Sequence, residues 1–177
     1  MASSLSSRLE KADNDTLKEI LREAESRLDA QLTMALAADL RAMTLLGFMV
    51  AVVAVVVAGT LAIYKSEHVD IFFGAVGLFA TFGMSVSSFY AFEAAKPIDF
   101  DAVGNYPSGW ASDAESGKPL HIALAEVCAH YDEMLKSNKA AMKSSSEHLL
   151  WSSQVALGTM FVSAFLVACR ILHLFPY

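Results

Sequence analysis

The side chains with spacing closest to that of a metal site lie between residues 119 and 148. His121, His130 and His148 do not have the i, i+4 spacing that a helical metal site prefers. Glu126 and His130 do have it, but Cys128, although close in sequence, points to another side of the helix. We therefore expect no metal ion and no other cofactor.

The chain contains no recognisable catalytic set. No nucleophile is spaced from a base, no pair of carboxylates has a catalytic arrangement, and no P-loop is present. The segment from Gly104 to Gly109 is not a phosphate-binding loop, because no strand precedes it and Pro107 interrupts it. We expect that the protein is not an enzyme.

Three polar side chains lie at the edges of long apolar runs: Asp39, Arg41 and Gln154. Asp39 would either select cations or bind a polar ligand, or form an interfacial ion pair with Arg41 or a lysine. Gln154, with Ser152 and Ser153, would either line a polar ring in a symmetric oligomer or hydrogen-bond to neighbouring helices. The sequence leaves both alternatives open.

The composition indicates a membrane protein. The 177 residues are 55% hydrophobic and only 18% charged, below the roughly 25% charged residues of soluble domains. The mean hydropathy is +0.43. The net charge of −6 and the absence of a basic stripe exclude nucleic acid as an expected partner. Cys128 and Cys169 lie in different environments, so no disulfide is predicted.

The apolar residues are concentrated in three runs, each close to the ~20 residues that span a bilayer. Between Met43 and Ile63 no charged residue occurs. We divide the chain into a disordered N-terminus (1–14), a cytosolic helix (15–42), a first transmembrane helix (43–64), a second (69–92), a cytosolic loop (93–118), a second cytosolic helix (119–148), a third transmembrane helix (149–172) and an external tail (173–177).

Two of the transmembrane helices are predicted to begin far outside the membrane. Thr16 and Glu19 fit a capping box, and no glycine or proline follows until Gly47. A second apolar stripe follows Pro119 without a breaker before Leu149. The predicted fold is therefore an all-α membrane protein with three transmembrane helices, two of them continuous with long parallel cytosolic helices that form a stalk.

The loop from residue 93 to 118 is rich in turn formers and carries three aromatic residues, Phe100, Tyr106 and Trp110. Loops of this length are unusual in compact proteins and are often either functional or disordered. We expect a docked loop that is able to bind a partner.

Small residues recur every four positions within the spans. Gly77, Thr81 and Ser85 do so in the second span, Ala54 and Ala58 in the first, and the third contributes Ala164. Such faces let helices approach closely where lipid supplies no hydrophobic driving force. They predict oligomer contacts or a pore wall, or alternatively packing of the three helices within one chain.

Basic residues set the predicted orientation. Arg22, Arg27 and Arg41 precede the first span and five lysines lie between the second and third, whereas the short connection holds only Lys65 and His68. By the positive-inside rule, the N-terminus is cytoplasmic and the C-terminus external. Arg170, near the external end, is an exception to this pattern.

The segment A-A-D-L-R-A-M-T-L-L at 37–46 resembles the D-x-[KR]-A-x-x-L start of the first membrane helix in Pycsar-type transmembrane effectors of cyclic-nucleotide antiphage systems, and more loosely in SLATT-type effectors. The end of the second span, 91–97, is also similar to theirs, so the resemblance covers about residues 37–97. It implies a dormant protein of the bacterial inner membrane that assembles on a cytosolic signal and impairs membrane integrity. No cyclic-nucleotide-binding residue is carried over.

The leading hypothesis is an oligomeric membrane protein that acts as a membrane-disrupting or pore-forming effector under the control of its cytosolic helices. Its expected partners are the lipid bilayer, further copies of the chain, and a cytosolic protein or small-molecule signal. The alternative is a membrane-anchored interaction module that recruits a cytosolic partner. A transporter would need charges in mid-span, which the sequence lacks.

Overall fold

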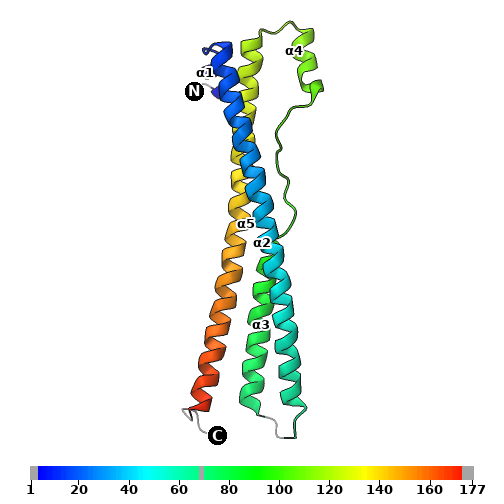
Figure 1. Cartoon of the computed structure of the whole chain (residues 1–177), viewed down its shortest axis with the longest axis vertical. Helices are drawn as coiled ribbons and strands as arrows, with labels where there is room; N and C mark the ends of the chain where they lie inside the picture. Colours follow the sequence, from blue (N-terminus) through cyan, green and yellow to red (C-terminus); the bar gives the residue numbers. More distant parts are fainter. Residues whose placement is uncertain (1–3, 68–69, 173–177) are drawn as a thin grey trace. The chain divides into compact units, whose positions relative to one another are not determined.

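The computed structural model describes residues 4–67 and 70–172, and this part of the chain is helical without strands (Figure 1). Three of its helices are long and apolar enough to cross a membrane. The elements, in order, are α1 (Leu5–Leu9), α2 (Asn14–Tyr64), α3 (Ile71–Ala94), the 3-10 helix η1 (Pro107–Trp110), α4 (Ala111–Glu115) and α5 (Leu120–Ile171). The predicted tail, 173–177, lies outside the described residues.

The long helices α2 and α5 each run without interruption, as the sequence predicts. The start of α2 differs from the prediction, because Asp13 replaces Thr16 as the capping residue. Its carboxylate accepts hydrogen bonds from the backbone N–H groups of Asp15 (3.0 Å) and Thr16 (2.9 Å). The pKa of the Asp13 carboxyl is lowered, and the hydrogen bond from the N–H of Thr16 is the largest cause. Thr16 lies inside the first turn, and Glu19 pairs with Arg22.

The chain forms two compact units, each built from separated stretches of sequence. The first unit consists of Met1–Ala37 and Ile98–Lys143, and the second of Ala38–Pro97 and Ser144–Tyr177. Both α2 and α5 contribute residues to each unit.

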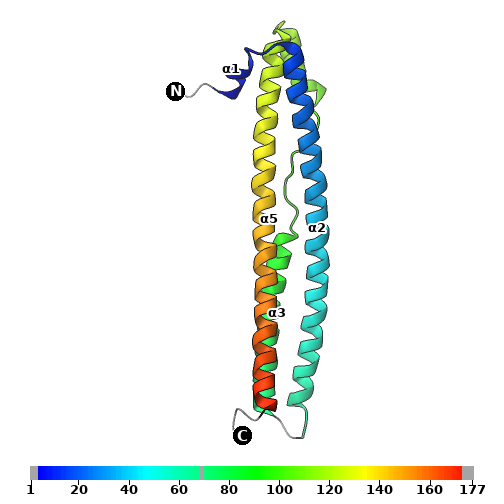
Figure 2. The same ribbon diagram turned by 60° about the vertical axis from the view of Figure 1, so that its left-hand side comes forward.

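In the first unit, the N-terminal parts of α2 and α5 pack together in parallel (Figure 2). Leu17 is buried against Leu124 and Cys128, and Leu28 is buried against Tyr131. Because residue numbers rise together on the two helices, their apolar stripes meet in the register of a parallel pair.

In the second unit, α3 packs with the remaining parts of α2 and α5 around a core of Met49, Met84 and Ala156. Asp70 caps α3 by accepting hydrogen bonds from the N–H groups of Phe72 (3.0 Å) and Phe73 (3.4 Å). Buried residues make up only 11%, 28% and 17% of the most apolar stretches of α2, α3 and α5. Most of this apolar surface therefore faces outward, as lipid-facing helices require.

Two predicted segments differ from the structure. The N-terminus, expected to be disordered, contains α1, whose first turn is capped by Ser4 through the N–H of Ser7. The predicted loop at 93–118 contains η1 and α4, and α3 extends to Ala94 instead of ending at residue 92.

Candidate functional site

A reciprocal pair of serines joins α3 to α5 in the second unit. The Ser87 hydroxyl donates to the carbonyl oxygen of Ser152 (2.8 Å), and the Ser152 hydroxyl donates to that of Ser87 (2.9 Å). Both side chains are fully buried. Because each side chain reaches the main chain of the other helix, this contact requires the two backbones to lie close together.

Further contacts join α3 and α5 on either side of the serine pair. The Ser145 hydroxyl donates to the carbonyl oxygen of Ala94 (2.7 Å). A Cβ atom at Gly83 would lie 2.2 Å from Oγ1 of Thr159, so only glycine fits there. Residue numbers fall along α3 as they rise along α5, which makes the pair antiparallel.

The predicted glycine, Gly77, packs within the chain. A Cβ atom at this position would lie 2.2 Å from Oγ1 of Thr60 on α2. For Gly77, the structure therefore supports packing of the helices within one chain. Thr81 is half-buried and donates to the Gly77 carbonyl oxygen of its own helix (2.9 Å).

The other predicted small residues take no part in the core of the second unit. Ser85, Ala54, Ala58 and Ala164 are all exposed. Ser152 was expected either to line a polar ring or to hydrogen-bond to a neighbouring helix, and within the chain it hydrogen-bonds to α3. Its partner Ser87, together with Thr60, Gly83 and Thr159, was not singled out by the sequence pattern, which followed spacings of four. The signal available was a mixed spacing of three and four, as at residues 84, 87, 91 and 94 of α3, all of which are buried.

The structure does not bring the predicted polar residues together. Asp39 is half-buried and Arg41 is exposed, and among the described residues no ion pair joins them. Gln154 is exposed, whereas Ser152, two positions earlier, is fully buried. Within one chain, Gln154 therefore belongs to a different face of α5 from the buried serine.

Arg170, which breaks the predicted charge pattern, lies beside Asp70. The guanidinium of Arg170 is 3.7 Å from the carboxylate of Asp70, and it also lies over the ring of Phe72, 5.6 Å from its centroid. The Arg170 side chain is only 15% exposed. The positive charge at this end of α5 is thus compensated by the residue that caps α3.

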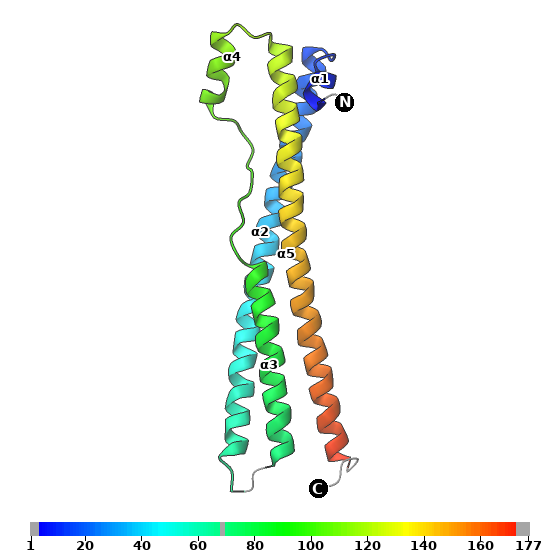
Figure 3. The same cartoon turned by 180° about the vertical axis from the view of Figure 1, so that it is seen from behind.

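In the first unit, an extended segment is fastened to α5 by a buried asparagine. We call residues 98–106, which precede η1, the strap (Figure 3). Oδ1 of Asn138 accepts the N–H of Asp101 (2.9 Å), and Nδ2 donates to the Asp101 carbonyl oxygen (2.9 Å). Asn138 is fully buried. One amide side chain therefore satisfies both polar groups of a backbone residue, as a neighbouring strand would.

Tyr131 ties the strap to both helices of the first unit. Its hydroxyl accepts the N–H of Gly104 (3.0 Å) and donates to the Glu25 carboxylate of α2 (3.4 Å). Gly104 has a φ of 108°, a conformation in which glycine is unstrained. Burial, the largest cause, raises the pKa of Tyr131.

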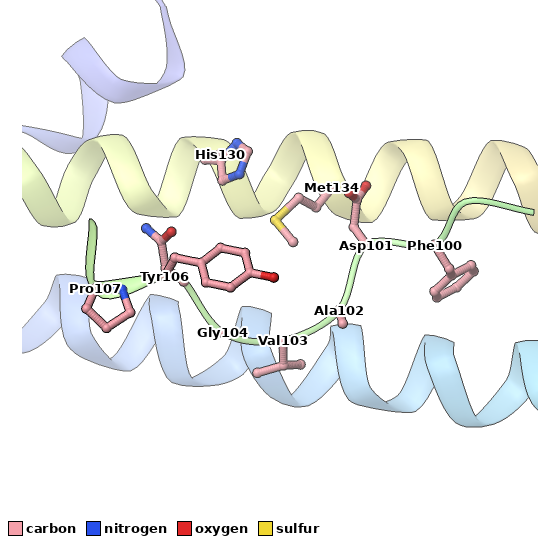
Figure 4. A pocket seen from close by; sticks show the side chains of 10 residues that line it. Phe100, Asp101, Ala102, Val103, Gly104, Tyr106, Pro107, His130 and Met134 are labelled. Carbon is pink, nitrogen blue, oxygen red and sulfur yellow. The ribbon is translucent and has the colours of Figure 1, made fainter. Parts of the chain in front are cut away.

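The three loop aromatics do not form one surface. Trp110 packs against the core around Leu17, so it belongs to the interior of the first unit. Tyr106 is 84% exposed, and Phe100 is half-buried. Both line a pocket of about 570 Å³, where the strap faces His130 and Met134 of α5 (Figure 4). The loop is docked as predicted, and Tyr106 remains accessible.

Charged groups fasten the segment after the strap. The ammonium group of Lys118 lies 3.2 Å from Asp113 on α4 and contacts Glu126 on α5. The hydrogen bond to Glu126 is the largest cause of the raised pKa of Lys118. Among the described residues, no three His, Cys, Asp or Glu side chains are grouped so as to hold a metal ion.

Similarity to other proteins offers no further assignment of these features. No protein-family model, no curated protein and no solved structure matches the chain.

Proposed function

We propose that the protein is an oligomeric integral membrane protein that acts as a membrane-disrupting or pore-forming effector. In this proposal α2, α3 and α5 cross the bacterial inner membrane, with the N-terminus in the cytoplasm and the C-terminus outside. The first unit is then a cytosolic stalk that controls the packing of the three spans. The outward-facing apolar residues of the second unit and the distribution of lysine and arginine support this location.

The observation that carries the proposal is an exposed face of small residues on α2. Gly47, Ala51, Ala54 and Ala58 are all exposed, and a Cβ atom at Gly47 would meet nothing within 4 Å. The packed side of α2, which includes Met49, is already occupied by α3 and α5. The small face therefore remains for another copy of the chain, and three helices alone are too few to enclose a channel.

Helix continuity offers a route for control. Since α2 and α5 contribute to both units without a break, a rotation or shift of either helix in the first unit must be accommodated in the second. The strap is hydrogen-bonded to Asn138 and Tyr131 of α5, and Tyr131 in turn donates to Glu25 of α2. A signal that moves the strap would therefore act on this helix pair.

The proposal is tested by measuring the oligomeric state of the protein and the leakage that it causes in liposomes. Purified full-length protein is measured by light scattering in mild detergent and by dye release from liposomes. Ala54→Leu with Ala58→Leu is expected to reduce both oligomerisation and release, because the larger side chains separate the helices. Ala75→Leu, on the exposed face of α3, is the control and leaves both unchanged. A monomeric protein that leaves liposomes sealed contradicts the proposal.

The exposed Tyr106 favours a second candidate, the membrane-anchored interaction module. Here the strap recruits a cytosolic partner and the spans serve as an anchor. Tyr106→Ser would then abolish activity in cells while liposome leakage stays as in the parent protein. Unchanged activity in cells would argue against the module.

A further inference from the structure

An apolar cavity of about 300 Å³ lies among α2, α3 and α5 in the second unit, and it opens outward beside Phe48 and Met160, which are 61% and 54% exposed. Each helix contributes one methionine to its wall: Met49, Met84 and Met160. Methionine side chains are flexible and polarisable, so they adapt to ligands of varied shape. The remaining lining residues are Phe48, Val52, Val56, Ala80 and Ser163.

Ser163 supplies the only polar side chain of this wall, and its hydroxyl oxygen is buried without a hydrogen-bond partner. The other serine and threonine side chains in the apolar parts of the described helices all donate to a main-chain oxygen. They are Thr44, Thr60, Thr81, Ser85, Ser87, Ser88, Ser152, Ser153 and Thr159. A buried hydroxyl without a partner is costly, and a ligand oxygen in the cavity would remove that cost.

We propose that this cavity binds a lipophilic small molecule whose one carbonyl oxygen accepts a hydrogen bond from Ser163. An engineered apolar cavity of ~150 Å³ holds benzene, so a cavity of about 300 Å³ suits a molecule roughly twice that size. The apolar wall favours a hydrocarbon body, and the single hydroxyl favours a single polar group.

The position of Ser163 distinguishes two sources of such a carbonyl. If α5 crosses the bilayer over 149–172, as the proposed function requires, Ser163 lies about 4 Å from the middle of the span at ~1.5 Å per residue. The ester carbonyls of phospholipids lie at the edge of a hydrocarbon core about 30 Å thick. A free lipophile reaches Ser163, whereas the ester of a bilayer lipid does not.

The methionines provide the measurement. Full-length protein with ¹³C-methyl methionine in phosphatidylcholine nanodiscs is titrated with 2-nonanone, and with n-nonane as the matched molecule without a carbonyl. We expect saturable shifts at Met49 and Met84, which are 5% and 4% exposed, with tighter binding of the ketone. Met43, exposed on α2, reports general partition into the bilayer, and Met134 in the first unit reports indirect effects.

Two variants test the site. Ser163→Ala is expected to weaken 2-nonanone binding about fivefold, the weight of one neutral hydrogen bond, and to leave nonane binding unchanged. Ala80→Leu fills the cavity and removes saturable binding of both, whereas the control Ala75→Leu does not. Persisting ketone preference in Ser163→Ala, or equal non-saturating shifts at Met43, would overturn the proposal.

A further experiment distinguishes a bilayer lipid from a free lipophile as the ligand. It also separates the cavity proposal from the effector proposal. In phosphatidylcholine nanodiscs before ketone is added, nuclear Overhauser effects from the lipid acyl methylene protons are expected to be absent at the methyl signals of the buried Met49 and Met84. Such effects there would show that a lipid chain fills the cavity, which overturns the assignment to a free lipophile. Leakage from liposomes is measured in parallel without ketone, so failure of the effector proposal is visible independently of ketone binding.

Discussion

At the scale of single residues, the contacts that define this molecule are hydrogen bonds from short side chains to the main chain of another segment. Ser87 and Ser152 reach each other's carbonyl oxygens, and Asn138 holds both backbone groups of Asp101. Each contact fixes one segment against another at a single register, because shifting either segment by one residue removes the partner.

Ser152→Ala is expected to weaken the association of α3 with α5. Interhelical hydrogen bonds in membrane proteins contribute about 0.6 kcal/mol on average and at most about 1.7 kcal/mol. Unfolding in bicelles measures the loss. Ser153→Ala is the matched control, because the Ser153 hydroxyl bonds only to Leu149 of its own helix. Equal losses in both variants would contradict the role of the serine pair.

Cys128 is expected to react slowly with iodoacetamide. Burial raises the pKa of its thiol, so at pH 8 it is less ionised than a free cysteine, and its reaction rate rises only at higher pH. Leu17→Ala opens the core beside it and should move the rate profile towards lower pH. Peptide mass spectrometry follows the modification. A rate equal to that of an unfolded peptide would show that Cys128 is accessible.

At the scale of elements, helix pairing depends on places where one helix lacks a side chain. Gly83 of α3 receives Thr159 of α5, and Gly77 receives Thr60 of α2. These positions hold α3 against both neighbours, while the cavity bounded by the three methionines remains open between them.

Gly83→Ala is expected to destabilise the second unit by about 1–3 kcal/mol, the usual cost of overpacking. The added Cβ would lie within 3.0 Å of three atoms of Thr159, so Thr159→Ala in the same chain should restore part of the stability. Gly158→Ala is the control, since a Cβ atom there meets nothing within 4 Å. Denaturation in bicelles measures the free energy of unfolding of each variant. A Gly83→Ala protein as stable as the parent would contradict the close contact between Gly83 and Thr159.

The elements were largely predictable from the sequence, and their pairing was not. Uninterrupted periodicity and charge-free runs predict the long α2 and α5, because these signals act within one segment. The choice between Gly77 as an oligomer contact and as an internal one depends on Thr60, which the pattern of α3 does not contain. Likewise, the aromatic residues of the loop predict that it docks, but only the position of Asn138 in three dimensions identifies Asp101 as its anchor.

At the scale of the whole molecule, one repeat organises α5. Leu124, Tyr131, Asn138, Ser145, Ser152 and Thr159 are each seven positions apart, and each contacts another segment of its own unit. Seven residues make nearly two turns, so these side chains share one face of the helix.

Inserting a single alanine between Ala140 and Ala141 is therefore expected to disturb this arrangement. One residue turns the helix by ~100°, so Asn138 and Ser145 no longer share a face. Hydrogen exchange at the Asp101 amide should become faster, or the second unit should lose stability. Ala140→Gln, a substitution at an exposed position that leaves the length of α5 unchanged, serves as the control. Full protection and stability after the single insertion would contradict the shared repeat.

The division of the sequence between the two units has a consequence for biosynthesis. Leu17 is made early, yet its partner Cys128 follows 111 positions later. The stretch 38–97, which carries the first two apolar helices, is complete before that partner leaves the ribosome. The first unit therefore forms only after residues 38–97 have been synthesised. Until then, the apolar stripe on the N-terminal part of α2 has no α5 to pack against.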